Sequence, residues 1–86
     1  MKLFIVRVVP SRGDDGILGN AFATRDAALE AIKKNEDEYH AECAPLEPGE
    51  EWFSSTTLWD EKDLEGIVAK VDTGDAEYFV YELEMA

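Results

Sequence analysis

Metal or nucleophile chemistry in this chain would depend on His40 and Cys43, because the sequence holds one histidine and one cysteine. Their spacing of three places them one turn apart on a helix, where both side chains point the same way. A structural zinc site needs four ligands, and no second Cys or His completes the set. A nucleophilic dyad or triad would have to use this same imidazole. We therefore expect no catalytic residue, no metal and no cofactor, with Cys43 as a small buried side chain.

Two acidic turns, at 14–16 (DDG) and 72–75 (DTGD), superficially resemble fragments of calcium loops. Calcium loops of the EF-hand type need oxygen ligands at alternate positions and a glutamate near the twelfth, and neither stretch provides them. Asp and Gly are the usual residues of tight turns. The glycine-rich loops that bind phosphate groups are missing from the sequence as well. These segments are best interpreted as turns.

Negative charge is the unusual property of the composition. Twenty Asp and Glu oppose eight Lys and Arg, for a net charge of −12 over 86 residues. A small soluble domain typically carries a net charge of about 2–8 in magnitude. Such an excess disfavours direct binding to nucleic acid or to an anionic membrane, and favours a basic partner. Solubility or a salt-rich habitat would also explain it.

The acids recur at spacings that could imitate a row of phosphates. Helix neighbours three or four apart lie about 5–6 Å from one another, and strand positions two apart about 6.6–6.8 Å. Lys33 and Lys34 interrupt the row. The residues expected to bind a partner lie between 26 and 51: Asp26, Glu30, Asp37, Glu38, Glu42, Glu47, Glu50 and Glu51.

A helix over 24–44 should position most of these acids. After Thr24 the segment has no Gly or Pro and one β-branched residue, Ile32, and Thr24 is a good N-cap. Its apolar stripe would run through Ala28, Ile32, Tyr39 and Cys43, with Asn35 interrupting it. An alternative ends the helix at Asn35 and makes 38–44 a strand.

Strands are predicted on both sides of this helix. Alternating or continuous apolar patterns favour strands at 2–9, 17–23, 52–59, 66–72 and 76–85, with hairpins across 10–16 and across the DTGD turn. The run at 2–9 is apolar enough to be buried on nearly both faces. Trp52 and Trp59 would point to opposite sides of their strand, and core packing is expected for both.

The predicted fold is a single α+β domain over 1–86, of order ββαβββ. A mainly antiparallel sheet of four to five strands would carry one long helix on one face, because the helix must bury its stripe against a flat surface. One cysteine excludes an internal disulfide and suits a reducing compartment. No signal peptide or membrane span is evident, so a cytoplasmic location is expected.

Small size, strong acidity, a lone helix on a sheet and no catalytic motif resemble phage-encoded anti-defence proteins. These include anti-CRISPR and anti-restriction inhibitors, several of which imitate DNA. The resemblance lies in composition and layout. It implies a non-enzymatic inhibitor in the host cytoplasm that occludes a basic nucleic-acid-binding protein, such as a host defence complex. The alternative is a small accessory or oligomeric interaction domain, for instance a homodimer, whose acidity serves solubility.

Overall fold

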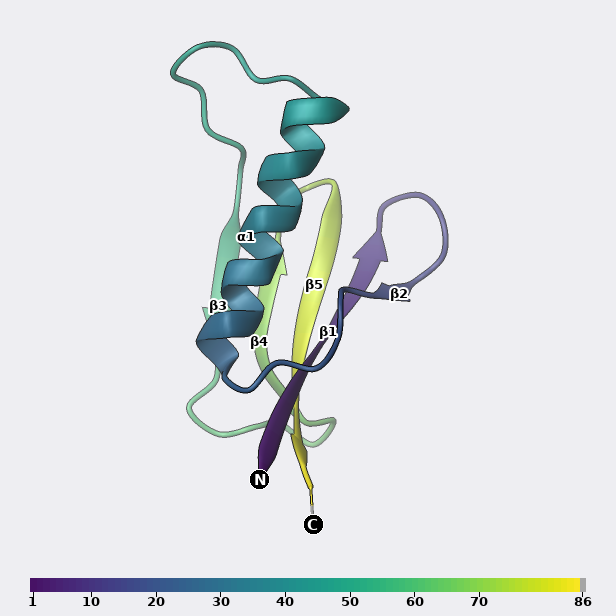
Figure 1. Cartoon of the computed structure of the whole chain (residues 1–86), viewed down its shortest axis with the longest axis vertical. Coiled ribbons are helices and arrows are strands. Elements are labelled where there is room, and N and C mark those ends of the chain that lie inside the picture. Colours follow the sequence, from purple (N-terminus) through teal and green to yellow (C-terminus); the bar gives the residue numbers. More distant parts are fainter. Residues whose placement is uncertain (86) are drawn as a thin grey trace.

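The computed structural model describes residues 1–85 of the 86-residue chain and shows a five-stranded antiparallel sheet with one helix on one face (Figure 1). The elements in chain order are β1 (Lys2–Pro10), β2 (Gly16–Ile17), α1 (Arg25–Glu42), β3 (Ser55–Leu58), β4 (Ile67–Asp72) and β5 (Ala76–Glu84). The α+β class and the order ββαβββ are confirmed. Within residues 1–85, no helix has the length and apolarity needed to cross a membrane.

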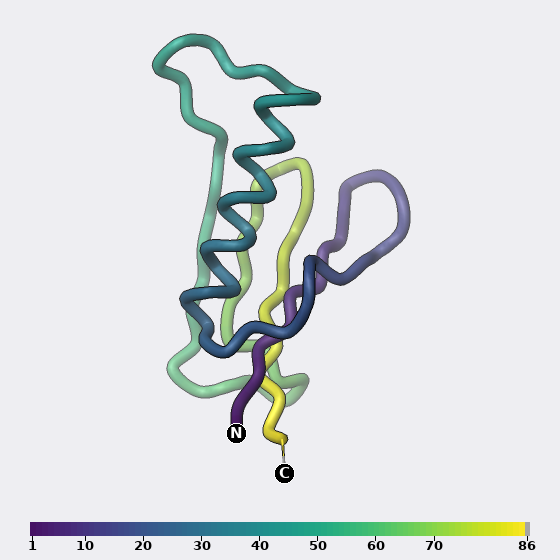
Figure 2. The backbone as a smooth tube through the Cα atoms, viewed as in Figure 1, coloured from purple at the N-terminus to yellow at the C-terminus, as the bar shows by residue number. Residues whose placement is uncertain are grey.

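The sheet is built around the pairing of its first and last long strands. Its order is β2-β1-β5-β4-β3, and β1 pairs with β5 over its whole length, from Lys2 opposite Glu84 to Pro10 opposite Ala76. The β4–β5 hairpin forms across the predicted turn. The backbone trace shows the two termini side by side at the end of the molecule remote from the loop that follows α1 (Figure 2).

Helix α1 is continuous through Asn35, so the alternative that ends it there is wrong. Thr24 is the N-cap, and its side-chain hydroxyl accepts a hydrogen bond from the Ala27 amide at 3.0 Å. Cys43 is the C-cap, with its own amide donating to the Tyr39 carbonyl at 2.7 Å. Good helix formers fill the second half of the segment, and they outweigh the single Asn.

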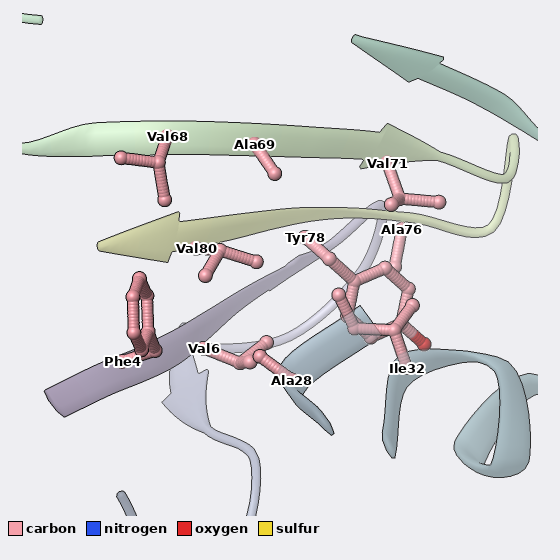
Figure 3. Packing of buried hydrophobic residues seen from close by; sticks show 10 residues of the cluster. All are labelled: Phe4, Val6, Ala28, Ile32, Val68, Ala69, Val71, Ala76, Tyr78 and Val80. Atoms are coloured by element: carbon pink, nitrogen blue, oxygen red, sulfur yellow. The ribbon is translucent and has the colours of Figure 1, made fainter. Parts of the chain in front are cut away.

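The core lies between α1 and the helix-facing side of β1, β5 and β4 (Figure 3). Alternate residues of β1 and β5 supply it, as the period of two requires, whereas β4 buries consecutive residues where its register shifts between Ile67 and Ala69. The buried apolar cluster consists of Phe4, Val6, Ala28, Ile32, Val68, Ala69, Val71, Ala76, Tyr78 and Val80. Full burial of one such large side chain stabilises the fold by about 1.5–3 kcal/mol. Ala28 and Ile32, the buried apolar residues of α1, thereby fix the first half of the helix on the sheet.

The predicted helix stripe is wrong beyond Ile32. Tyr39 and Cys43 are exposed, and the third buried position of α1 is Glu36. Asn35, which interrupts the apolar pattern, donates from Nδ2 to the Tyr78 hydroxyl at 3.0 Å. The sheet therefore meets the second half of the helix through polar contacts, and a pattern of apolar residues could not reveal them.

Two predicted strands are shorter than expected. The strand expected at 17–23 is reduced to Gly16–Ile17 plus one isolated bridge between Phe22 and Phe4. Gly19 has φ +64°, a left-handed conformation that ends regular pairing here. The strand expected at 52–59 is limited to Ser55–Leu58, which pairs with β4 at the sheet edge.

Within residues 1–85 no helix or strand packs on the face of the sheet opposite α1, so the expectation that β1 is buried on nearly both faces is wrong: its residues on this face are half-buried. Arg7 of β1 lies on this open face, with its guanidinium carbon 5.3 Å from the centre of the Phe79 ring. Lys70 approaches the same ring at 5.7 Å, and Arg7 Nη1 donates to the Tyr81 hydroxyl at 3.1 Å. Cation–π contacts and half-buried side chains therefore cover this side of the sheet.

Candidate functional site

The predicted acidic residues line a groove between α1 and the segment that leads into β3. Asp26, Glu30 and Asp37 share one flank of the helix, because their spacings of four and seven keep them in line. Glu30 and Asp37 line a groove of about 520 Å³ together with Glu50 and Glu51. The structure thus brings half of the predicted acids to one concave surface.

The other predicted acids extend this surface around the helix. Glu38 and Glu42 lie on the outer, exposed side of α1, and Glu47 lies in the exposed loop that follows it. Among residues 1–85, Asp37 is the one member of the eight that forms an ion pair, with Lys33 at 3.4 Å. The remaining seven carboxylates are exposed and free of ion pairs in this part of the chain. We call these eight residues the acidic surface.

Trp52, which also lines the groove, joins the loop to the helix. Its indole Nε1 donates to Asp37 Oδ1 at 2.7 Å, and this hydrogen bond, helped by Lys33, lowers the pKa of Asp37 below its ordinary value of 3.8. The same indole stacks on the His40 ring, with centroids 6.3 Å apart and planes 13° from parallel. Trp52 and Trp59 are half-buried, and neither belongs to the buried cluster, so the expected core packing of both is wrong.

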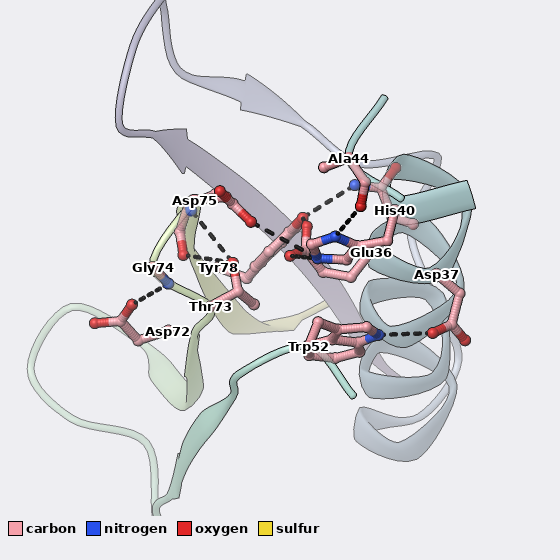
Figure 4. Close-up of polar contacts among 12 residues, drawn as sticks. Glu36, Asp37, His40, Ala44, Trp52, Asp72, Thr73, Gly74, Asp75 and Tyr78 are labelled. Atoms are coloured by element: carbon pink, nitrogen blue, oxygen red, sulfur yellow. Dashed lines mark hydrogen bonds and ion pairs between the residues drawn. The ribbon is translucent and has the colours of Figure 1, made fainter. Parts of the chain in front are cut away.

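A second group of polar residues lies next to Trp52, where α1 meets the β4–β5 turn (Figure 4). Glu36 is 2% exposed, and its Oε2 accepts a hydrogen bond of 2.7 Å from the Tyr78 hydroxyl. Burial, reinforced by this carboxylate, raises the pKa of Tyr78 well above its ordinary value. The Tyr78 hydroxyl therefore stays protonated and donates its hydrogen bond to Glu36 at any physiological pH.

His40 faces two carboxylates from this group. Its Nδ1 lies 3.1 Å from the Ala44 carbonyl oxygen. Its Nε2 lies 3.7 Å from Glu36 Oε1 and 3.7 Å from Asp75 Oδ2. Glu36 and His40 are one turn apart on α1, whereas Asp75 reaches the same point from the β4–β5 turn.

The turn that carries Asp75 is held in a defined shape. Gly74 has φ +82°, which glycine adopts without strain, and its amide donates to Asp72 Oδ1 at 2.9 Å. The Thr73 amide donates to the Ala76 carbonyl oxygen at 3.0 Å, and the Ala76 amide donates to the Thr73 hydroxyl at 3.2 Å. Asp75 is thereby presented from a rigid hairpin end.

The sequence reasoning found His40 and missed its neighbours. The spacing of four between Glu36 and His40 was the available signal. Asp75 gave none, because only the sheet pairing brings residue 75 next to residue 40. Cys43, which lies one helical turn from His40, is exposed. Within residues 1–85, no group of three potential metal ligands includes it.

No family model, curated protein or solved structure matches this chain.

Proposed function

We propose that this protein is a non-enzymatic acidic inhibitor that binds a basic, nucleic-acid-binding protein in the cytoplasm of a host cell. Its carboxylates would occupy the Lys and Arg side chains that otherwise hold phosphates, in the manner of phage anti-defence proteins that imitate DNA. The observation that carries the proposal is the set of seven exposed carboxylates without ion pairs on α1 and its following loop.

The arrangement of these acids supports occlusion by charge. Unpaired carboxylates are available to a partner without first breaking contacts inside the protein. A field of one sign steers a basic partner toward the surface and raises the association rate at low salt. Trp52 adds a half-buried aromatic side chain to the groove that Glu30, Asp37, Glu50 and Glu51 line, and aromatic residues contribute strongly to protein interfaces.

The test compares two variants that change net charge equally. Glu30→Lys, Glu38→Lys and Glu42→Lys together reverse three acids of the surface. Asp37 is left intact because reversing its charge would also break its hydrogen bond to Trp52. Immobilised protein is first used to capture basic proteins from the native host. Each captured protein is then bound to a fluorescently labelled DNA duplex, and displacement of the duplex by the wild-type or variant protein is measured.

We expect the wild-type protein to displace the duplex and the triple variant to do so at least about tenfold less effectively. Raising NaCl from roughly 0.05 to 0.5 M should weaken the wild-type complex to a similar extent, because screening shortens the reach of charge. The matched control reverses Asp60, Glu61 and Glu65, which are exposed acids outside the acidic surface, and should keep full activity.

Equal activity of the two triple variants would contradict the proposal. It would favour the second candidate, an oligomeric interaction domain. The observation that favours this candidate is the free edge of β3, where Ser55–Leu58 is exposed along its length and carries no charge. Light scattering that shows a homo-oligomer unaffected by either triple variant would support it.

A further inference from the structure

We propose that Glu36, His40 and Asp75 bind one divalent transition-metal ion, such as Zn²⁺, that links α1 to the β4–β5 turn. One nitrogen and two carboxylate oxygens from these residues lie within 4.8 Å of one another. The three side chains point toward a common centre in the close-up view (Figure 4). This inference concerns a different site from the acidic surface and does not depend on the proposed function.

The orientation of His40 presents a lone pair to this centre. A ring nitrogen 3.1 Å from a carbonyl oxygen has to be the donor, so Nδ1 carries a proton. In the neutral ring Nε2 is then unprotonated and faces the site. Histidine metal ligands are typically oriented in this way, with the non-ligating nitrogen donating to a backbone carbonyl.

The buried carboxylate of Glu36 independently indicates that a positive group binds here. Its side chain is 3% exposed, yet Oε1 has no hydrogen-bond partner, while Oε2 is satisfied by Tyr78. His40 Nε2 is buried and lacks a hydrogen-bond partner too. Polar atoms buried without partners are costly and rare in folded proteins. Here two such atoms face each other.

A proton on Nε2 would balance the charge without satisfying the geometry. Both carboxylate oxygens lie 3.7 Å from Nε2, beyond the range of a hydrogen bond. A metal ion, by contrast, lies between its ligands. Ligand atoms about 2.0–2.2 Å from a tetrahedral ion are about 3.3–3.6 Å apart. The two distances from His40 Nε2 exceed this separation by a few tenths of an ångström, and the two carboxylate oxygens, which lie within 4.8 Å of each other, would be drawn together by the ion.

The ligand types indicate which ions fit. One imidazole and two carboxylates suit Zn²⁺ and its neighbours in the first transition row better than they suit Ca²⁺, which prefers six to eight oxygens. Asp75 is 46% exposed, and Glu36 and Asp75 also line a cavity of about 330 Å³. The exposed side of Asp75 therefore gives the ion a path of entry.

The residues around the site would hold its ligands in place. Asn35 donates to the Tyr78 hydroxyl, which donates in turn to Glu36, so the carboxylate is fixed with Oε1 toward the centre. Trp52 stacks on the His40 ring. Such outer contacts typically change metal affinity by about 10–100-fold when they are removed.

Trp52 also provides a direct probe of binding. The experiment uses protein with Cys43→Ser, which removes the thiol as a rival ligand, and Trp59→Phe, which leaves Trp52 as the only tryptophan. After EDTA treatment and dialysis at neutral pH, Co²⁺ is titrated while Trp52 fluorescence is recorded, and Zn²⁺ binding is measured by calorimetry. We expect one equivalent of either ion to bind, Co²⁺ to quench Trp52, and Zn²⁺ to raise the midpoint of thermal unfolding.

Asp75→Asn and His40→Gln test the ligands. Each should lower Zn²⁺ affinity at least about tenfold and reduce quenching by Co²⁺. Asp75→Asn is the decisive change, because the described contacts of this side chain are with His40 alone, so its loss should leave folding intact. Glu38→Gln and Glu42→Gln on the same helix each remove equal charge at an exposed position outside the site and should bind as the parent does. Equal affinities in all four variants, or no saturable binding in the parent, would overturn the proposal.

Discussion

The hydrogen bond between Tyr78 and Glu36 is almost fully shielded from water, with the two residues 1% and 2% exposed. A buried carboxylate is costly unless it is hydrogen-bonded. Tyr78 offsets this cost at Oε2 and itself accepts from Asn35 Nδ2. One hydroxyl group thus satisfies two side chains of α1. Its removal would leave both without that partner.

Tyr78→Phe should lower the free energy of unfolding by about 1–3 kcal/mol, because buried polar groups would lose their partner while the ring still packs in the core. Urea denaturation monitored by circular dichroism in the presence of EDTA measures the change. EDTA excludes any contribution from bound metal.

Tyr81→Phe is the matched control. Its hydroxyl accepts from Arg7 on the half-buried open face, where water can replace the lost contact. The expected loss is under about 1 kcal/mol. Equal losses in the two variants would show that the buried position of the Tyr78 hydroxyl adds nothing to stability.

At the scale of elements, the start of α1 is fixed by two kinds of contact. Thr24 caps the helix, and Arg25 Nη1 donates to the Trp59 carbonyl oxygen at 2.9 Å. The second contact ties the first helical residue to the connection between β3 and β4. Capping lowers the energy of the helix itself, whereas the Arg25 contact fixes where the helix begins on the sheet.

Thr24→Ala should cost about 0.5–2 kcal/mol of stability, since the Ala27 amide would lose its side-chain acceptor. Thr24→Ser keeps the hydroxyl and should stay close to the wild type. The urea midpoints of the two variants give the comparison. A loss of the same size with serine would mean that the methyl group, and not the cap, supports the helix.

Local patterns predicted most elements of the fold and little of the buried polar site. The cap at Thr24, the β4–β5 hairpin and the continuous helix follow from residues close together in the chain. The end of β2 at Ile17 was not predicted, because Gly19 permits the left-handed φ of +64° that it adopts here but does not require it. The burial of Glu36 depends on Tyr78, 42 residues away, which no periodicity relates to it. The positions of the acids along the groove likewise depend on Trp52 folding the loop back onto Asp37.

At the scale of the whole molecule, a net charge of −12 opposes folding, because a compact shape brings like charges together. Added salt should therefore stabilise the protein. We expect the urea midpoint to rise between roughly 0.05 and 0.5 M NaCl, as the Debye length shortens toward a few ångströms. Measurements in EDTA again keep metal binding out of the comparison.

The variant with Asp60, Glu61 and Glu65 changed to Lys has a net charge of −6. It is the control that tests whether self-repulsion causes the stabilisation by salt. It should respond less to salt than the wild type does. An identical response would indicate that specific ion effects, and not self-repulsion, set the salt dependence.

The pairing of β1 with β5 has a consequence for how the chain acquires its structure. Contacts between Lys2 and Glu84 join residues 82 positions apart, and β5 also separates β1 from β4 in the sheet. Until β5 has been synthesised, β1 lacks its main partner and α1 lacks part of the surface on which it packs, so the core cannot close. Topologies dominated by such distant pairings fold slowly. Until then the nascent chain would remain open, and the mutual repulsion of its acidic residues would protect it from aggregation.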